Sequence, residues 1–418
     1  MIERDMKKRV VITGMGALTS LGLSVEETWS ALVAGRSGIG PITRFDASQL
    51  PIRIAGEVKG FDPTQYIDFK EVRRMARCSH LAVAAATQAL ADAGLGDQVP
   101  DPERAGTVMG TGVGGLELAL EGWDTFKSKG LRRVSPFVAT ASLCNMPAHH
   151  VSLRFQCQAH NATVVTACAS GTQAIGEAAE AIRRGAAELM LAGGVEGLIH
   201  EVIIGGFTVM RVLAADNEHP ERACKPFDAR RDGFVTAEGT AVMVLERLDK
   251  ALDRGARIHA EVLGYAANTD AFHVAAPDPE GAGAIRVMRW ALESAGVSPT
   301  EIDYINAHGP GTDVGDRVET KAIKALFGER AYRVPISSTK SMVGHAMGGA
   351  GAIEALACVK TITDGIIHPT INYEVPDPEC DLDYVPNVAR RADVRMTLSN
   401  SFGLGGQNAC LALARFEE

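Results

Sequence analysis

Short apolar runs alternate with longer helical stretches along the chain, and this alternation constrains the fold more than any other feature. In the first half, five runs have the length and composition of buried strands, namely 10–13, 106–109, 164–167, 189–192 and 241–246. Helical stretches cover 78–93 and 170–184. Strands that alternate with helices of this length are typical of parallel α/β layers.

The second half repeats this pattern. Its expected strands are 260–266, 304–307, 336–338 and 395–399, and its expected helices are 283–294, 316–327 and 348–363. A helix-like stretch near 248–257 joins the halves, without a Pro/Ser-rich linker. We therefore predict one body built from two similar α/β halves, residues 1–255 and 256–418.

Charge and composition limit the class of protein. The 418 residues include 42 Lys and Arg and 51 Asp and Glu, a formal net charge of −9, which argues against nucleic-acid binding. A chain that is 46% hydrophobic and 22% charged is not disordered. Eight cysteines without a CxxC pair indicate reduced thiols and a cytoplasmic location rather than a disulfide framework.

Two apolar segments have features of targeting or membrane segments. The run after the basic residues 7–9 resembles a secretory signal, but Thr13 and Gly14 interrupt it, which favours a buried strand. Residues 155–176 carry no charge, yet they include Gln156 and Asn161, which are costly in lipid. No membrane span is therefore expected.

Cys168 lies in the most informative segment, VVTACASGTQAIGEAAEAIRRG. A β-branched strand leads into a turn of small residues, and a helix rich in Ala and Glu follows. Cys168 is therefore expected at a helix N-terminus, where aligned peptide dipoles favour an anion and lower the pKa of a thiol. From these residues alone, a nucleophile and a buried structural cysteine remain equally open.

Two histidine motifs and a glycine-rich loop add to this picture. His308 follows a strand in DYINAHGPGTDVGD, and His345 follows Lys340 in ISSTKSMVGHAMGGAGAIE. A neutral imidazole can donate to a developing oxyanion, and a lysine can orient its neighbours. The loop in SNSFGLGGQNACLALA can present backbone N–H groups or act as a gate, although a plain hairpin turn also explains its glycines.

Two other ligand motifs are weak. Residues 110–115 contain GxGxxG after a strand, but 127–131 offers no carboxylate for a ribose, so dinucleotide binding is not expected. His149, His150, Cys157 and His160 match no zinc-ligand spacing.

Taken together, these motifs resemble those of the β-ketoacyl-acyl-carrier-protein synthases, within the elongating type II branch. The resemblance covers nearly the whole chain, and it is carried by VVITGMGALTSLG, TACASGTQAIGEA, FDARRDGFV, DAFHVAAPDPEGAGA, NAHGPGT, STKSMVGHAMGGAGAIE and NSFGLGG. It implies an α/β thiolase-like fold of two stacked halves in αβαβα layers, a homodimer, and decarboxylative condensation of malonyl-carrier with an enzyme-bound acyl chain.

The resemblance also implies residue roles. Cys168 corresponds to the nucleophile that accepts the acyl chain as a thioester. His308 and His345 correspond to the pair that promotes decarboxylation and stabilises the enolate oxygen. The N–H groups of Cys168 and Leu404 correspond to an oxyanion hole, and Phe402 and Leu404 to a gating loop.

Supporting residues follow from the same resemblance. Lys340 and Glu354 correspond to a buried charged pair behind the histidines, with Asp316 and Glu319 close by. Thr312 corresponds to a contact with the phosphopantetheine arm, which the acyl carrier protein supplies. We therefore expect no cofactor of the enzyme's own and no metal.

The net-negative chain must meet its acidic carrier through a local basic patch. The resemblance places this patch at Lys70, Arg73, Arg74, Arg132, Arg133 and Arg211.

The acyl pocket is expected to differ from that of ordinary relatives. The resemblance places Val113, Val138 and Phe207 at substrate positions, and both valines are smaller than the residues that the family often has there. With Leu404 in place of a gate phenylalanine, this predicts a preference for long or unusual acyl chains, against which the large Leu198 argues. Other departures from the family pattern are Pro310, Ala275, Ala276, Ala237 and Gln407.

Three alternatives stay open at this point. A polyketide or nodulation-factor type ketosynthase would differ in its acyl substrate and carrier. A catalytically silent chain-length-factor subunit usually lacks the nucleophile, which is present here as Cys168. A dinucleotide-binding oxidoreductase would have to bind NAD(P).

Overall fold

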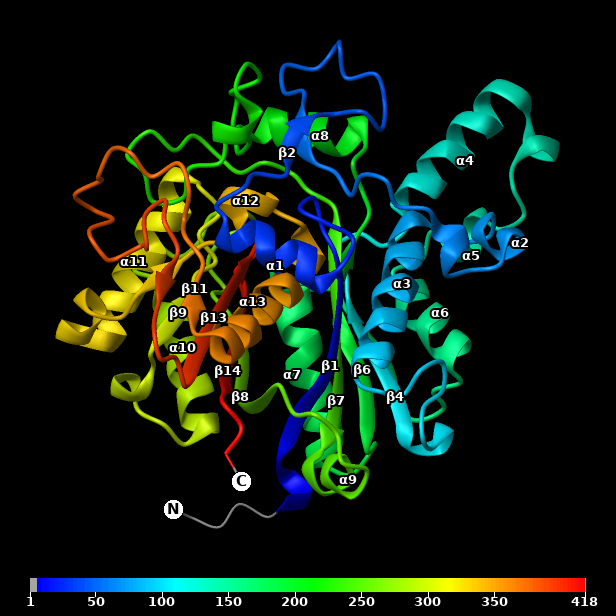
Figure 1. Ribbon diagram of the computed structural model, residues 1–418. Coiled ribbons are helices and arrows are strands. Elements are labelled where there is room, and N and C mark those ends of the chain that lie inside the picture. Colours follow the sequence, from blue (N-terminus) through cyan, green and yellow to red (C-terminus); the bar gives the residue numbers. More distant parts are fainter. Residues whose placement is uncertain (1–5, 418) are drawn as a thin grey trace.

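The computed structural model describes residues 6–417. Its centre is a ten-stranded sheet in the order β10-β9-β13-β14-β8-β1-β7-β6-β4-β5 (Figure 1). The first half of the chain supplies β1 (Val10–Leu18), β4 (Ala105–Gly110), β5 (Asn161–Val164), β6 (Leu189–Glu196) and β7 (Gly239–Arg247). The second half supplies β8 (Ala260–Thr269), β9 (Tyr304–Asn306), β10 (Ile336–Ser337), β13 (Met396–Gly403) and β14 (Gln407–Ala414).

Strand directions follow the same scheme in the two halves. Counting outward from β1, the pairs β1–β7 and β7–β6 are antiparallel, and β6–β4 and β4–β5 are parallel. Counting outward from β8, β8–β14 and β14–β13 are antiparallel, and β13–β9 and β9–β10 are parallel. The halves join where β1 pairs with β8 and Val10 lies opposite Val262. The two similar halves predicted for the fold are therefore confirmed.

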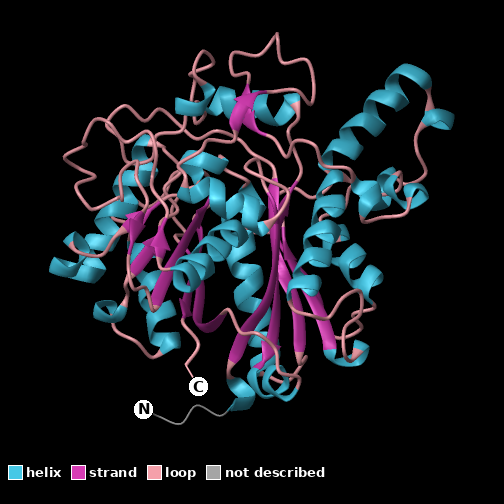
Figure 2. Ribbon diagram, viewed as in Figure 1, coloured by secondary structure: helices cyan, strands magenta, loops and turns pink. Residues whose placement is uncertain are grey.

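Helices form three layers around the sheet (Figures 1 and 2). Between the halves lie α7 (Ser170–Arg183) and α13 (Ala350–Asp364). The outer face of the first half is covered by α3 (Arg77–Asp92) and α6 (Met146–Phe155), and that of the second half by α10 (Ala282–Ala295) and α11 (Asp313–Phe327). The expected αβαβα layering is present.

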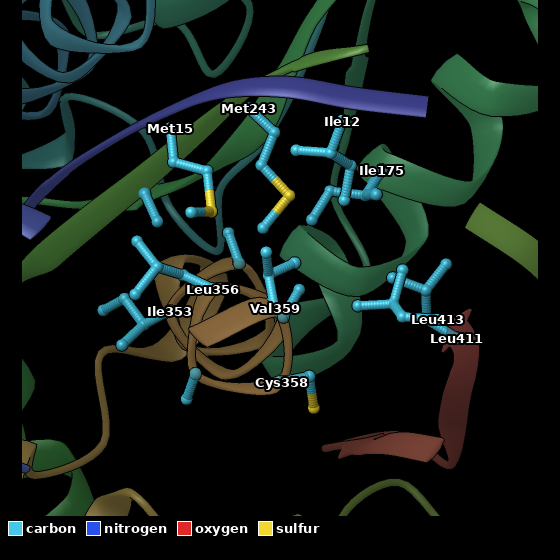
Figure 3. Packing of buried hydrophobic residues seen from close by; sticks show 14 of the residues in the cluster. Ile12, Met15, Ile175, Met243, Ile353, Leu356, Cys358, Val359, Leu411 and Leu413 are labelled. Carbon is cyan, nitrogen blue, oxygen red and sulfur yellow. The ribbon is translucent and has the colours of Figure 1, made fainter. Parts of the chain in front are cut away.

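The central layer holds the largest apolar core. Figure 3 shows α13 with Ile353, Leu356 and Val359 directed toward neighbouring elements. They pack among side chains of β1, β7, α7 and β14, which are Ile12, Met15, Met243, Ile175, Leu411 and Leu413. Because both halves contribute to one core, burial of this apolar surface holds them together.

Small residues let the layers approach closely. A Cβ atom added to Gly14 or Gly16 of β1 would lie 2.2 Å from the carbonyl oxygen of Ala89 or 2.0 Å from that of Ala85 in α3. Only glycine allows the backbone of α3 to lie this near to β1. These glycines, which interrupt the apolar run near the N-terminus, are therefore packing sites of the first strand.

The remaining elements lie around this frame. A lobe beside α3 contains α2 (Phe69–Val72), α4 (Leu116–Lys129) and α5 (Val138–Ala141) (Figure 1). Further helices are α1 (Val25–Val33), α8 (Glu201–Met210), α9 (Leu248–Asp253) and α12 (Lys340–Val343). Two small sheets pair β2 (Ile39–Pro41) with β3 (Ile54–Gly56) and β11 (Ile366–Ile367) with β12 (Arg390–Arg391). Within residues 6–417, no helix has the length and apolar character of a membrane span.

Two of the expected boundaries are wrong in informative ways. The strand predicted at 164–167 is β5, Asn161–Val164, because the chain must turn after Val164 to place Cys168. The helix predicted from 316 begins at Asp313, where the Thr312 hydroxyl accepts the N–H of Gly315 and caps it. Both errors lie beside site residues. The first comes from the turn before Cys168, and the second from a local cap signal at Thr312 that the prediction did not use.

Candidate active site

A cavity of about 600 Å³ opens at the carboxyl ends of β8, β9 and β13. Residues from both halves of the chain line it, including the predicted site residues Cys168, Arg211, His308, Thr312, His345, Phe402 and Leu404. Cys168 is only 5% exposed, yet it borders this cavity together with both histidines. The structure thus brings the thiol and the two imidazoles to one space.

Cys168 is held by a tight turn between β5 and α7. The turn Ala167–Ala169 is a short 3₁₀ segment, and Ala167 has φ = 49°, a left-handed conformation that is unfavourable for an L-residue. The Ser170 hydroxyl accepts the N–H of Thr166 at 2.9 Å and donates to the carbonyl oxygen of Ala167 at 2.7 Å. The predicted elbow is present, and it sets Cys168 directly before the first turn of α7.

The prediction of a lowered thiol pKa is wrong for the resting protein. Burial raises the pKa of Cys168 to about 11, because the thiolate would lose its hydration. The N–H of Leu404 and the ammonium group of Lys340 oppose this increase, but they do not cancel it. Cys168 is therefore a neutral thiol near neutral pH.

His308 lies on the loop after β9, and buried side chains hold this loop by its backbone. The Glu319 carboxylate accepts the N–H groups of His308 and Gly309 at 2.9 and 2.8 Å. Lys340 Nζ donates to the carbonyl oxygen of His308 at 2.6 Å and lies 3.4 Å from Nδ1 of the ring. Because an ammonium group stands beside Nδ1, we assign the ring proton of His308 to Nε2.

The two imidazole rings lie close and nearly perpendicular, with centroids 5.5 Å apart and an interplanar angle of 79°. Burial lowers the pKa of both rings well below the usual histidine value, and the Lys340 charge adds to this effect. Both rings are therefore neutral near pH 7. The ring of Phe234 packs edge-on against His345 at 5.2 Å. A pair of neutral N–H donors can stabilise a developing oxyanion.

Behind the histidines, Lys340 and Glu354 form an ion pair in which each side chain is 1% exposed. The hydroxyl of Ser401 donates to the other oxygen of Glu354 at 3.4 Å and lies 2.8 Å from the hydroxyl of Thr172. Burial raises the pKa of Glu354, and the Lys340 charge opposes this. The charged pair inferred from the resemblance is thus present, and it connects α13 to α12 and β13.

Asp316 holds the next part of the His308 loop. Its carboxylate accepts the N–H groups of Phe227 at 2.7 Å and Gly311 at 3.1 Å. Burial raises the pKa of Asp316 to about 7, although these bonds and the neighbouring Arg231 act against it. Asp316 and Glu319 therefore accept hydrogen bonds from the backbone, and none of these bonds involves an imidazole ring.

Sequence reasoning missed Arg231, although the motif FDARRDGFV contains it. Its buried guanidinium donates to the carbonyl oxygens of Thr312 at 3.2 Å and Asp313 at 3.0 Å. It also binds the Asp377 carboxylate at 2.7 Å. Arg231 thus fixes the end of the loop that begins at His308. A charged residue in a motif such as FDARRDGFV is too common to indicate that its side chain holds a distant loop.

The glycine-rich loop is the turn of the β13–β14 hairpin, so the hairpin interpretation is confirmed, and a role of this turn as a gate stays a prediction. The ring of Phe402 lies 5.9 Å from that of His308. Gly405 and Gly406 have φ of 82° and 71°, which a side chain would disfavour. The carbonyl oxygen of Gly406 accepts the N–H of Asp270 at 2.8 Å, which ties this turn to the loop after β8.

Three predicted substrate residues, Val113, Val138 and Phe207, are not among those that line the cavity. Phe207 packs against Phe234, whose ring contacts His345, so it lies one layer behind the site. Their assignment to an acyl pocket stays a prediction. Of the departures from the family pattern, Ala275, Ala276 and Pro310 line the cavity, whereas Ala237 and Gln407 do not.

The predicted docking residues fall into two groups. Arg211 lines the cavity. The others belong to the lobe, where Arg74 pairs with Glu71 at 2.8 Å and Arg73 stacks over Phe69 at 4.7 Å. The lobe lies on the opposite side of the molecule from α11, whose first residues line the cavity (Figure 1). A single chain therefore does not place all the predicted docking residues at the cavity mouth.

The glycine-rich loop 110–115 and the possible zinc ligands are the two weak motifs of the sequence. The N–H of Gly112 in the glycine-rich loop donates to the carboxylate of Glu196 at 2.7 Å, so this loop binds a side chain of the protein itself. Across residues 6–417, no three His, Cys, Asp or Glu side chains are arranged to hold a metal ion.

Two like halves in five layers, with a cysteine from one half and two histidines from the other in a shared cavity, define a condensing enzyme of the thiolase-like class. This chain belongs to the β-ketoacyl synthase family. Residues 7–251 match the family's N-terminal domain, and residues 259–374 match its C-terminal domain.

Individual relatives agree with this membership. The chain is 46% identical over 411 residues to "3-oxoacyl-[acyl-carrier-protein] synthase 2" of Synechocystis sp. PCC 6803, covering 98% of this chain and 99% of that protein. Among solved structures, the ishigamide ketosynthase/chain length factor is 38% identical, covers 98% of this chain and 99% of its own, and has a TM-score of 0.91. A type II polyketide ketosynthase in complex with its acyl-carrier protein is 32% identical, with coverage of 98% and 99% and a TM-score of 0.88. The protein is therefore an acyl-transferring enzyme.

Proposed function

We propose that this protein is a 3-oxoacyl-[acyl-carrier-protein] synthase that elongates fatty-acyl chains. The observation that carries the proposal is the meeting of Cys168, His308 and His345 at one cavity. The identity of 46% to a synthase of this name over nearly the whole chain supports it. The lower identity of 32% to a type II polyketide ketosynthase favours fatty-acyl over polyketide substrates.

In the first half-reaction, the Cys168 sulfur loses its proton and attacks the carbonyl carbon of an acyl thioester on the acyl carrier protein. The acyl bond to the carrier's sulfur breaks, and the carrier leaves as a free thiol. The N–H groups of Cys168 and Leu404 are the proposed donors to the oxyanion. The Leu404 N–H, which already lowers the thiol pKa, supports this role.

In the second half-reaction, a malonyl thioester loses carbon dioxide. The electron pair of the broken carbon–carbon bond stays on the remaining fragment, which is an enolate. Nε2–H groups of the neutral His308 and His345 donate to the enolate oxygen. The carbanion equivalent then attacks the Cys168 thioester, a carbon–carbon bond forms, and the Cys168 thiolate leaves and regains a proton. The product is a 3-oxoacyl chain on the carrier.

The remaining residues are proposed to support these steps. Lys340 orients His308, with Glu354 balancing its charge, and Thr312 contacts the phosphopantetheine arm at the cavity wall. This chemistry needs no resident metal or organic cofactor, because two N–H donors suffice for the enolate and the carrier brings its own arm.

We also propose that the enzyme acts as a cytoplasmic homodimer. β5 is one end of the ten-stranded sheet, and its outer edge pairs with no other strand in the described chain. Val165, directly after β5, is an exposed apolar side chain, and the lobe exposes four more at Trp123, Phe126, Leu131 and Leu143. An unpaired edge with apolar neighbours can take a second copy. Sedimentation velocity should give twice the 44.2-kDa chain mass, and a monomer at micromolar concentration would contradict the dimer.

The central experiment incubates the protein with acyl-carriers and malonyl-carrier and weighs the products. We expect carrier-bound chains longer by two carbons with a 3-oxo group, and loss of this product after Cys168 is alkylated by chloroacetamide or cerulenin. Products only from polyketide starter units would support the alternative ketosynthase. Absence of any condensation product with intact protein would refute the proposed function.

A further inference from the structure

Glu196 is a buried carboxylate at the end of β6 that the proposed reaction does not use. It is 1% exposed. Its Oε2 atom accepts the N–H of Gly112 at 2.7 Å and that of Gly348 at 3.2 Å, and its Oε1 atom accepts the Thr111 hydroxyl at 3.3 Å. Within residues 6–417, no Lys, Arg or His forms an ion pair with it.

These bonds join two separate segments. Gly112 belongs to the loop that follows β4, and Gly348 belongs to the turn Met347–Gly349, which begins two residues after His345. Met347 itself lines the cavity, and it has φ = 42°, which is strained for a residue with a side chain. Glu196 is thus the bridge between the β4 loop and the strained turn beside His345.

The junction has no room for a replacement contact. A Cβ atom on Gly348 would lie 2.3 Å from the nitrogen of Gly112, and one on Gly171, at the start of α7, would lie 2.9 Å from the oxygen of Gly348. The turn after His345 is therefore wedged between the β4 loop and the helix that follows Cys168. If the carboxylate were lost, two buried N–H groups would lack their acceptor.

We infer that Glu196 is a positioning residue, which fixes the turn after His345 through the N–H groups of Gly112 and Gly348 and so holds His345 ready for decarboxylation. This inference rests on the proposed condensing activity. This role depends on the hydrogen bonds that Glu196 accepts and not on its charge, because a neutral amide oxygen in the same place can accept both N–H groups.

The surroundings of the carboxylate agree with a role that depends on bonds. Burial raises the pKa of Glu196 to about 7, and the nearby Glu117 carboxylate adds to this effect, while its three hydrogen bonds oppose it. The other titratable groups that feel its charge are the thiols of Cys78, Cys144 and Cys168. None of these groups is a cation.

The test compares two variants of Glu196 with a matched control. Glu57 is also buried, and it accepts the N–H groups of Thr43 and Arg44 and the Thr43 hydroxyl, so Glu57→Ala removes a similar set of bonds elsewhere. Each full-length variant is assayed separately for acyl transfer to Cys168 and for release of carbon dioxide from malonyl-carrier. Melting temperature and circular dichroism establish that each variant is folded.

Glu196→Ala should lower kcat for decarboxylation by about tenfold or more, since small misplacements of catalytic groups have effects of this size. Acyl transfer should fall by no more than about threefold, as in Glu57→Ala, and Glu196→Gln should restore decarboxylation to within about threefold of wild type. Equal losses in both half-reactions, no loss of decarboxylation, or a glutamine variant as impaired as the alanine variant would each overturn the inference.

A third variant separates this inference from the proposed function. His345→Ala should abolish decarboxylation if the proposed function is correct. If His345→Ala decarboxylates at the wild-type rate, the proposed function fails. If His345→Ala is inactive and Glu196→Ala is normal, only the role of Glu196 fails.

Discussion

Lys340 Nζ lies 2.6 Å from the carbonyl oxygen of His308 and 3.4 Å from Nδ1 of the same residue, so one ammonium group controls both the backbone and the ring of this histidine. Lys340 also forms a buried ion pair with Glu354. The position of His308 and the charge balance of the core therefore depend on a single side chain.

Replacing Lys340 tests that dependence. Lys340→Met should reduce decarboxylation of malonyl-carrier by about 100-fold, and it should destabilise the fold by about 3–5 kcal/mol because Glu354 loses its partner. Adding Glu354→Gln should recover most of the stability without recovering the activity. Chemical denaturation and carbon dioxide release measure the two effects. Recovery of activity in the double variant would contradict the role of Lys340.

The raised thiol pKa predicts how Cys168 reacts with alkylating agents. With a pKa of about 11, the thiolate fraction grows with pH throughout the accessible range. The alkylation rate should rise by about tenfold per pH unit from pH 7 to 10. Mass spectrometry of the Cys168 peptide measures it, in a Cys144→Ser background that removes the half-buried thiol. A plateau below pH 9 would show that the resting thiol is already activated.

Asp316 predicts a pH dependence of stability. Burial raises its pKa to about 7, so the folded protein keeps a proton that the unfolded chain has released between about pH 4 and 7. The free energy of unfolding should therefore fall as the pH rises through this window. Asp316→Asn lacks this contribution. The stability of wild type relative to the variant should thus decrease by on the order of 2 kcal/mol between pH 5 and 8. Urea denaturation at several pH values measures this, and a constant difference would refute it.

The basic patch predicts a selective effect on carrier binding. Reversing Arg73, Arg74 and Arg132 to Glu should raise KM for acyl-carrier by about tenfold, with kcat and melting temperature nearly unchanged. Arg289→Glu is the control, because Arg289 is an exposed arginine on α10, away from the lobe. The wild-type KM should also increase with salt. An unchanged KM in the triple variant would exclude this docking surface.

Chain-length preference tests the predicted acyl pocket. The small side chains of Val113 and Val138, with Leu404 at the gate, predict that long acyl-carriers are still elongated efficiently. Replacing Val113 with Phe should shorten the accepted chain without slowing transfer of short acyl groups. Competition assays with acyl-carriers of graded length measure the profile. A sharp loss of activity at medium length in the wild type would refute the prediction.

Features that repeat along the chain could be predicted from the sequence. The alternation of apolar runs and helices predicted two like halves. A turn of small residues between a strand and a helix predicted where Cys168 would lie, and a glycine-rich turn after another strand predicted where His308 would lie. Such patterns work because strand and helix periodicity reflects which face is buried.

Features set by tertiary contacts could not be predicted. The thiol pKa of Cys168 depends on burial, which outweighs the helix dipole that the local pattern suggested. The roles of Arg231 and Glu196 depend on backbone groups far away in sequence, such as the carbonyl oxygen of Thr312 and the N–H of Gly348. No local pattern marks a side chain that will bind a distant main chain.

The junction between β1 and β8 carries a consequence for how this enzyme matures. The thiol of Cys168 comes from one half of the polypeptide, and the imidazoles of His308 and His345 come from the other. Neither half alone contains both reactive groups. The cavity that all three side chains line is therefore complete only when the second half has folded against the first.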